Sequence, residues 1–172
     1  MDTPPNYGIV KNQPLNKNNL LTTHYRLGIK RLPTTMYFCQ SANIPGLAMV
    51  TVEQPTSFNP IIRSGGRVLQ EDLKISFVVD EDFKNWREVR NWILNCTDYT
   101  DYLEYKVPSE HLSDEITLFV LDSNHQEVSK VVFYNAFPNY LSGIEYNSTN
   151  PSTDPVICQA TFAYTYYKIF DL

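Results

Sequence analysis

The run LKISFVV at residues 73–79 decides the fold, together with the acids DED at 80–82 and the segment FKNWREVRNWILN at 83–95 that follow it. Apolar side chains occupy every second position of the first run, which predicts a half-buried strand. Three acids ahead of apolar residues spaced three to four apart predict the start of a helix, because carboxylates accept the free amide protons there. We therefore expect a strand that leads directly into one helix over about residues 82–95.

Four further segments carry the alternation or the apolar, β-rich composition of strands. They are residues 22–30, 36–41, 116–136 (a hairpin around a turn at 122–125) and 156–167. Pro33 separates the first two, and the run FPNYLSG at 137–143 is expected to end the hairpin. With twelve Tyr and nine Phe, this pattern predicts a mainly β fold with a single α-helix, in which two antiparallel sheets pack as a sandwich or barrel-like structure.

Two segments lack such a pattern. Residues 1–21 are rich in Pro and Asn and predict an extended N-terminal arm, which cannot order itself by its own burial. Residues 44–66 begin like a strand, lose the pattern, and end in a turn at 64–66, so they predict a long contact-making loop. The chain is thus expected to be an arm followed by a single β domain over residues 22–172.

Size and charge narrow the class of protein. A chain of 172 residues and 19.9 kDa suits one compact domain. The net charge of −5 excludes the usual footprint of a nucleic-acid-binding protein, which needs a basic face. Residues 1–50 carry +4 and residues 51–172 carry −9. This asymmetry is either a chance gradient that folding spreads over the surface or a sign of subunits that attract one another head to tail.

The sequence shows no pattern of catalytic or metal-binding residues. His24, His111 and His125 lie in unrelated segments, and the three cysteines form no C-x-x-C pair. The acids at 80–82 could be a metal or glycosidase site, but their position favours helix capping. We therefore expect no enzyme, metal or cofactor. No apolar run is long enough to span a bilayer, so no membrane anchor is expected.

Five runs occur in an order that includes a Pro-Gly turn, a strand, an acidic helix start with a tryptophan, and an alternating final strand. They are MYFCQSANIPG at 36–46, EQPT at 53–56, RSGG at 63–66, LKISFVVDEDFKNW at 73–86 and ATFAYTYY at 160–167. Together they resemble the tail-tube proteins of contractile-tailed (myovirus-type) bacteriophages, a family related to the type VI secretion tube proteins. The resemblance spans roughly residues 25–169.

The resemblance implies a structural protein of the virion. In that family, hexameric rings of antiparallel sheets surround a channel and stack into the tube that conducts DNA at ejection. The implied partners are further copies of the chain, the tail sheath protein and the proteins at the baseplate and neck ends of the tube, with assembly in the host cytoplasm. DNA would pass through the lumen without specific binding, since an acidic channel does not retain a phosphate polymer.

The resemblance also suggests which residues make contacts. Strand edges would join neighbours within a ring, and the loop at 44–66 would join successive rings. The candidates in this loop are Ile44, Glu53, Phe58, Ile61 and Arg63.

Two further predictions concern a tryptophan and a strand face. Trp92 lies off the apolar stripe expected for the helix, so it either faces a neighbouring subunit or widens the apolar face. A long strand with a polar face is the natural lining of a channel. Gln159, Thr161 and Thr165 are therefore candidates for the lumen, unless that face looks outward.

Three functions follow. The first is a tail-tube subunit repeated in many stacked rings. The second is a specialised ring of the same fold, either an initiator on the baseplate or a terminator near the neck, because the N-terminal arm is longer than a plain tube subunit needs. The third, from a different class, is a small cytosolic β-sandwich enzyme or binding module, which predicts a monomer with a ligand pocket.

Overall fold

The computed structural model describes residues 18–97, 114–147 and 154–172. Along the chain, the helices and strands of the described residues are β1 (Tyr25–Ile29), α1 (Pro33–Tyr37), β2 (Cys39–Ala42), β3 (Leu47–Gln54), β4 (Ile61–Gln70), β5 (Leu73–Val78), α2 (Lys84–Thr97), β6 (Asp114–Leu121), β7 (Glu127–Leu141), β8 (Ile157–Ala163) and β9 (Tyr166–Asp171). None of the helices described is long and apolar enough to cross a membrane.

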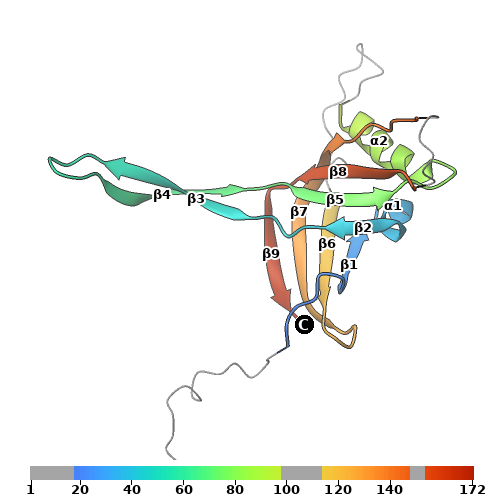
Figure 1. Cartoon of the computed structure of the whole chain (residues 1–172), viewed down its shortest axis with the longest axis horizontal. Helices are drawn as coiled ribbons and strands as arrows, with labels where there is room; N and C mark the ends of the chain where they lie inside the picture. The colour runs from blue at the N-terminus through green and yellow to red at the C-terminus, as the bar shows by residue number, and fades with distance from the viewer. Residues whose placement is uncertain (1–17, 98–113, 148–153) are drawn as a thin grey trace, which may run out of the picture.

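The body of the molecule is built around the long strand β7. The strand order is β1-β6-β7-β8-β5-β2, and β9 also pairs with β7. The first part of β7 pairs with β6 and β9, and its second part pairs with β8. Two antiparallel layers therefore share this strand: an A layer, β1-β6-β7-β9, and a B layer, β2-β5-β8-β7 (Figure 1). The expected antiparallel sheets are confirmed, but no barrel closes, because β1 and β2 do not pair with each other.

The core lies between the inner faces of the two layers and α2. Phe77, Phe133 and Phe162 from β5, β7 and β8 are fully buried there. The alternation of β5 puts Leu73, Ile75 and Phe77 into this core, as the sequence predicts. Each such side chain contributes about 1.5–3 kcal/mol on burial, so the body is stabilised by its own packing.

The predicted helix is confirmed as α2, and it begins with a capping carboxylate. Asp80 accepts hydrogen bonds from the amides of Lys84 (3.1 Å) and Asn85 (2.9 Å). The buried Asn85 side chain donates to the Val78 carbonyl at 2.6 Å, which fixes the helix to the end of β5. Asp82 forms an ion pair with Lys84. The acids therefore cap a helix, and nowhere in residues 18–97, 114–147 and 154–172 do three or more ligating side chains form a group that could hold a metal.

The expectation of a single helix is wrong, because the five-residue α1 occupies the start of the strand predicted at 36–41. Pro33 sits in its first turn, where the missing N–H costs nothing. The Thr34 and Thr35 hydroxyls donate to the Glu88 carboxylate (2.7 Å) and to the Asn85 carbonyl (3.1 Å) of α2. These tertiary bonds outweigh the alternating pattern, and only Cys39–Ala42 forms a strand.

Two predicted boundaries near the C-terminus are also wrong. The hairpin around residues 122–125 is confirmed, but β7 does not end before Phe137 as expected: it continues to Leu141. Among the described strands, only β8 pairs with this part of β7, so the opposite edge of β7 makes no ladder hydrogen bonds here. Pro138, which has no backbone N–H to donate, is therefore tolerated. The long strand predicted at 156–167 is divided into β8 and β9, because both follow the same bent strand.

The stretch at 44–66 is not an irregular loop. Most of it belongs to the β3–β4 hairpin, which extends far from the body as a two-stranded ribbon (Figure 1). Of the predicted N-terminal arm, residues 1–17 lie outside the described residues. Residues 18–21 have neither helix nor strand and are exposed.

Candidate assembly surfaces

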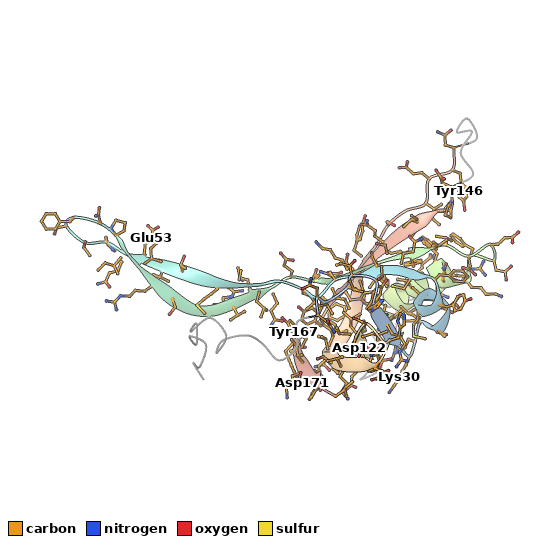
Figure 2. The ribbon with its side chains drawn as sticks, turned by 60° about the horizontal axis from the view of Figure 1, so that its bottom comes forward. Lys30, Glu53, Asp122, Tyr146, Tyr167 and Asp171 are labelled. Atoms are coloured by element: carbon orange, nitrogen blue, oxygen red, sulfur yellow. The ribbon has the colours of Figure 1, made fainter. Side chains whose placement is uncertain are left out.

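The β3–β4 hairpin is held only at its base. Its strands pair from Leu47 opposite Gln70 to Gln54 opposite Ile61, and the Glu71 amide donates to the Gly46 carbonyl at 3.2 Å where the ribbon leaves the body. Among the described strands, none other pairs with β3 or β4. Figure 2 places Glu53 on this ribbon, far from Lys30 and Asp122 in the body. The hairpin therefore offers both of its faces and both of its edges to other molecules.

A glycine bulge divides the ribbon into a basal and a distal half. The register shifts between Met49 and Thr51, where β4 contains extra residues. A Cβ on Gly65 would lie 2.8 Å from the Val50 carbonyl oxygen, and Gly66 has φ +66°. Both positions favour glycine because one has no space for a side chain and the other has a left-handed backbone.

Large apolar side chains occupy both faces of the ribbon. Paired residues share a face, so Met49 and Val68 lie together, whereas neighbouring Leu69 points the opposite way. The exposed apolar side chains are Leu47, Met49, Val52, Ile61, Ile62, Val68 and Leu69, with Phe58 at the tip, 96% exposed. An isolated two-stranded hairpin is marginally stable in water, and a long apolar surface of this kind marks an interaction site.

The structure brings together four of the five residues predicted to make contacts between rings. Glu53, Phe58, Ile61 and Arg63 all lie in the distal half of the hairpin, with Glu53 and Ile61 close to the tip. Ile44 lies before the base, where it is 45% exposed. Whether these residues touch another ring remains a prediction.

Sequence reasoning missed most of the apolar ribbon. No pattern in the sequence indicated the exposed basal residues Leu47, Met49, Val68 and Leu69. A strand with apolar side chains on both faces lacks the period of two by which a half-buried strand is predicted. The bulge at Gly65 and Gly66 also interrupts the pattern of β4. The signal that could have found them is the high apolar content on both sides of a short loop.

Trp92 is buried in the body of its own chain. Its side chain is only 4% exposed and packs against Phe162, with the ring centroids 5.8 Å apart. The Arg31 guanidinium lies 5.5 Å from the centroid of its indole. Val89 and Trp92 are both buried on α2, which fits the alternative interpretation of a broad apolar face and leaves little of the Trp92 side chain for a neighbouring subunit to contact.

The lumen candidates fall in two places. Gln159 and Thr161 lie on the outer face of the B layer, since the intervening Cys158, Ala160 and Phe162 are buried. Thr165 lies between β8 and β9, where its hydroxyl accepts a hydrogen bond from Asn135 at 3.4 Å. The structure therefore unites two of the three predicted residues.

The outer face of the B layer carries a row of small polar side chains, flanked by the exposed Ile157, Tyr140 and Phe137. Ser41, Ser76 and Gln159 lie side by side on β2, β5 and β8, and the two serine hydroxyls are 2.7 Å apart. Ser142 continues this row, because its hydroxyl accepts from the Gln159 amide at 2.9 Å. Lys74 is the charged side chain in the central strand of this face. Such a row offers hydrogen bonds with little net charge.

Two tyrosines of the body, Tyr25 and Tyr164, have raised pKa values. Burial raises the pKa of Tyr164 to about 12, and nearby Tyr167, Asp72 and Glu71 add to the effect. Burial likewise raises the pKa of Tyr25 to about 12, with Cys39 adding to it. The Tyr164 hydroxyl donates to the Glu71 carbonyl at 2.8 Å, which ties the C-terminal segment to the base of the hairpin.

A family model described as "phage tail tube protein" matches residues 15–170. The chain belongs to the phage tail tube protein family. It is 30% identical over 161 residues to the tail tube terminator protein of Enterobacteria phage T4, covering 88% of this chain and 89% of that protein. The expected relationship to contractile-tail tube proteins is thus confirmed.

Two solved structures share the fold. One is the tube-terminating cap of the anti-feeding prophage, at TM-score 0.65 and 15% identity, covering 96% of this chain and 100% of that one. The other is a sheath/tube terminator of an extracellular contractile injection system, at TM-score 0.57 and 16% identity, covering 92% and 98%. At these identities, the likeness extends to the fold alone.

Proposed function

We propose that this chain is a tail tube terminator, a structural subunit whose hexameric ring closes one end of a phage tail tube. The observation that carries the proposal is the 30% identity to the phage T4 terminator, which extends over nearly the whole of both chains. The fold is common to several tube components, so it does not favour a repeated tube subunit. The specialised ring, our second expectation from the sequence, is therefore preferred to the main tube subunit.

The shape of the molecule supports a role at a tube end. A subunit that offers complementary surfaces on both sides builds an open filament, whereas a ring that binds the filament on one side only ends it. The described part of the chain has one long apolar projection, the β3–β4 hairpin, and it points away from the body in one direction (Figure 1). We assign this hairpin, with Phe58 at its tip, to the contact with the adjacent tube ring.

The B layer suits the wall of a channel. If the outer face that carries this polar row lines the lumen, ring closure requires the two edges of the layer, β2 and the second part of β7, to meet those of neighbouring subunits. Following the antiparallel pairs from β7 through β8 and β5 to β2 shows that β2 runs antiparallel to β7. Identical subunits around a ring can therefore pair these edges in an antiparallel manner. Gln159 and Thr161 would then face DNA with hydrogen-bonding groups that do not retain phosphates.

The implied partners follow from this position. They are the tube subunit below the ring and the tail sheath protein, because a related fold occurs in a sheath/tube terminator. The chain would reside in the virion after assembly in the host cytoplasm. Its role is to complete an assembly, and no catalytic step is assigned to it.

Counting the copies per virion tests the proposal. Quantitative mass spectrometry of purified particles should find one ring's worth of this chain, against many rings' worth of the tube subunit. A count equal to that of the sheath protein would instead identify the main tube subunit. Absence from purified particles would reject both roles and return the chain to the class of soluble binding modules.

A further inference from the structure

The sheet path leaves an open seam between its two terminal strands, β1 and β2. Their side chains meet where the Tyr25 hydroxyl lies against the Cys39 thiol, but the backbones do not pair. A groove of ≈ 870 Å³ runs along this seam. Its walls come from β1, from α1 and from the start of β2. We call it the seam groove. Its accepting edge is that of β1, which is distinct from the hairpin, the B-layer face and the β2 edge assigned above to the tube and to ring closure.

The edge of β1 that faces the seam groove has unpaired backbone groups. The His24 carbonyl accepts from the Leu121 amide, so in this antiparallel register His24, Arg26 and Gly28 turn their backbone groups toward β6. Tyr25 and Leu27 therefore turn theirs toward the groove. Nothing in the described part of the chain pairs with these N–H and C=O groups. A strand edge in this condition is a template for another strand.

Apolar side chains accompany this edge. Met36 and Tyr37 of α1 form one wall of the groove, and Tyr37 is 82% exposed although it is a large aromatic residue. Gly28 has no side chain, and a second hollow of ≈ 350 Å³ opens beside it against Phe119. An added strand would thus find a backbone partner and apolar contacts together.

Cations lie on the outer face of the A layer beside the groove, in a chain whose net charge is −5. Arg26, Phe119, Lys130 and Phe170 form one row across the outer face of the A layer. Arg26 lies over the Phe119 ring at 4.6 Å, and Lys130 lies over the Phe170 ring at 5.5 Å.

Further charges lie beside this row. Lys30 lines the second hollow together with Glu115. Glu127 pairs with Arg26, while Lys30 and Lys130 have no carboxylate partner among the described residues. The cations near the β1 edge, Arg26, Lys30 and Lys130, thus outnumber the carboxylates Glu115 and Glu127 by one, which leaves a small positive excess for an acidic segment to match.

We propose that the seam groove accepts an extended, acidic segment of another protein, which adds to the free edge of β1 as an antiparallel strand. Alternating side chains would put carboxylates beside Arg26 and Lys30 and apolar groups against the α1 wall. The aromatic side chains of Phe119 and Phe170 already have a cation over one face. This disfavours nucleic acid as the partner, because bases need a free aromatic face on which to stack.

A second copy of the chain fits this edge poorly. The other free edge of the A layer is β9, whose outer face carries Lys168. Pairing β9 of one copy with β1 of the next would bring Lys168 beside Arg26 and Lys30, and like charges in adjacent strands repel. The acidic partner is therefore a different protein.

The test uses the full chain and a synthetic ten-residue peptide that alternates valine with glutamate. A matched peptide alternates valine with lysine. Fluorescence anisotropy should show the acidic peptide binding about tenfold more tightly than the basic one. Hydrogen exchange should show the Tyr25 and Leu27 amides slowed about tenfold by the acidic peptide. Lys30→Glu should weaken the acidic peptide several-fold, whereas the control Lys168→Glu, the same charge change at the far edge of the same face, should leave its affinity within about twofold.

Four results would overturn the proposal. Binding without protection of Tyr25 and Leu27 would mean that no strand is added. Equal losses in Lys30→Glu and Lys168→Glu would mean diffuse attraction. Tighter binding of a ten-nucleotide thymidine oligomer than of the acidic peptide would identify a nucleic-acid surface. A dimer of the full chain that dissociates on Lys30→Glu would show that a second copy occupies the edge. None of these outcomes depends on the chain being a tube terminator.

Discussion

The body and the β3–β4 hairpin both contain many apolar side chains, but these are buried in the body and exposed in the hairpin. In the body, every second side chain of β5 and β8 is buried, and α2 is fixed through the buried Asn85. In the hairpin, eight large apolar side chains lie exposed on two faces and the tip. The difference separates folding from assembly: the body is stabilised by its own core, whereas we infer that the hairpin gains its apolar contacts from another chain.

The largest contrast is expected between two phenylalanines. Phe133→Ala in the core should lower the free energy of unfolding by about 3–5 kcal/mol, because it opens a cavity. Phe58→Ala at the hairpin tip should change it by less than about 0.5 kcal/mol but weaken binding to the tube about tenfold or more. Urea unfolding and co-sedimentation with purified tubes measure the two effects. Equal loss of stability in both variants would contradict the separation.

The polar anchor of the body can be tested next. Asn85→Ala removes the hydrogen bond to the Val78 carbonyl and should cost about 1–3 kcal/mol, because that carbonyl is left without its partner. Asn59→Ala, in the exposed tip of the hairpin, is the matched control and should be nearly neutral for unfolding. Thermal unfolding followed by circular dichroism gives both values. A neutral Asn85→Ala would show that α2 is held by apolar packing alone.

The bulge tests the hairpin by itself. Gly65→Ala puts a Cβ against the Val50 carbonyl oxygen and should destabilise the ribbon locally by about 1–2 kcal/mol. Amides of β3 and β4 should then exchange about tenfold faster, with no change in the melting temperature of the body. Gly143→Ala, where the added Cβ meets nothing within 4 Å, is the control. A lower melting temperature in Gly65→Ala would mean that the two regions unfold together.

The smallest effect is on the pH dependence of the body. The pKa of Tyr164 is about 12 in the folded chain and about 10 when unfolded, so the unfolded state ionises first as pH rises. Stability present below pH 10 should be lost between about pH 10 and 12, by at most about 1 kcal/mol because the ring is partly solvated. Tyr164→Phe should flatten this loss in melting curves between pH 8 and 11. An equal flattening by Tyr146→Phe, an exposed control, would contradict the assignment.

The sequence predicts the body better than the hairpin for a physical reason. The alternation at 73–79 and the acids at 80–82 predict β5 and α2, because one side of each element is buried and the other is not. The β3–β4 ribbon has apolar residues on both faces, so no such contrast exists. The five-residue α1 depends on bonds from Thr34 and Thr35 to a helix fifty residues away, which no local pattern records.

Site prediction follows the same division. The family resemblance suggested Phe58 and Ile61 as contacts between rings, and the structure places both of them exposed in the distal half of the hairpin. The prediction for Trp92 left two alternatives open, because a position off the expected apolar stripe does not show whether the side chain is buried. Its burial depends on Phe162, which lies beside it only in the folded chain. The seam groove was not predicted at all, since it depends on two strand edges that are neighbours only in the folded chain.

The central claim is that this chain occupies one end of the tail tube. Electron microscopy of purified tails in which the chain carries a single gold-binding tag at its C-terminus tests it most directly. The account predicts gold at one end of each tail and none along its length. Gold distributed along the whole tube would contradict it and identify the chain as the repeated tube subunit.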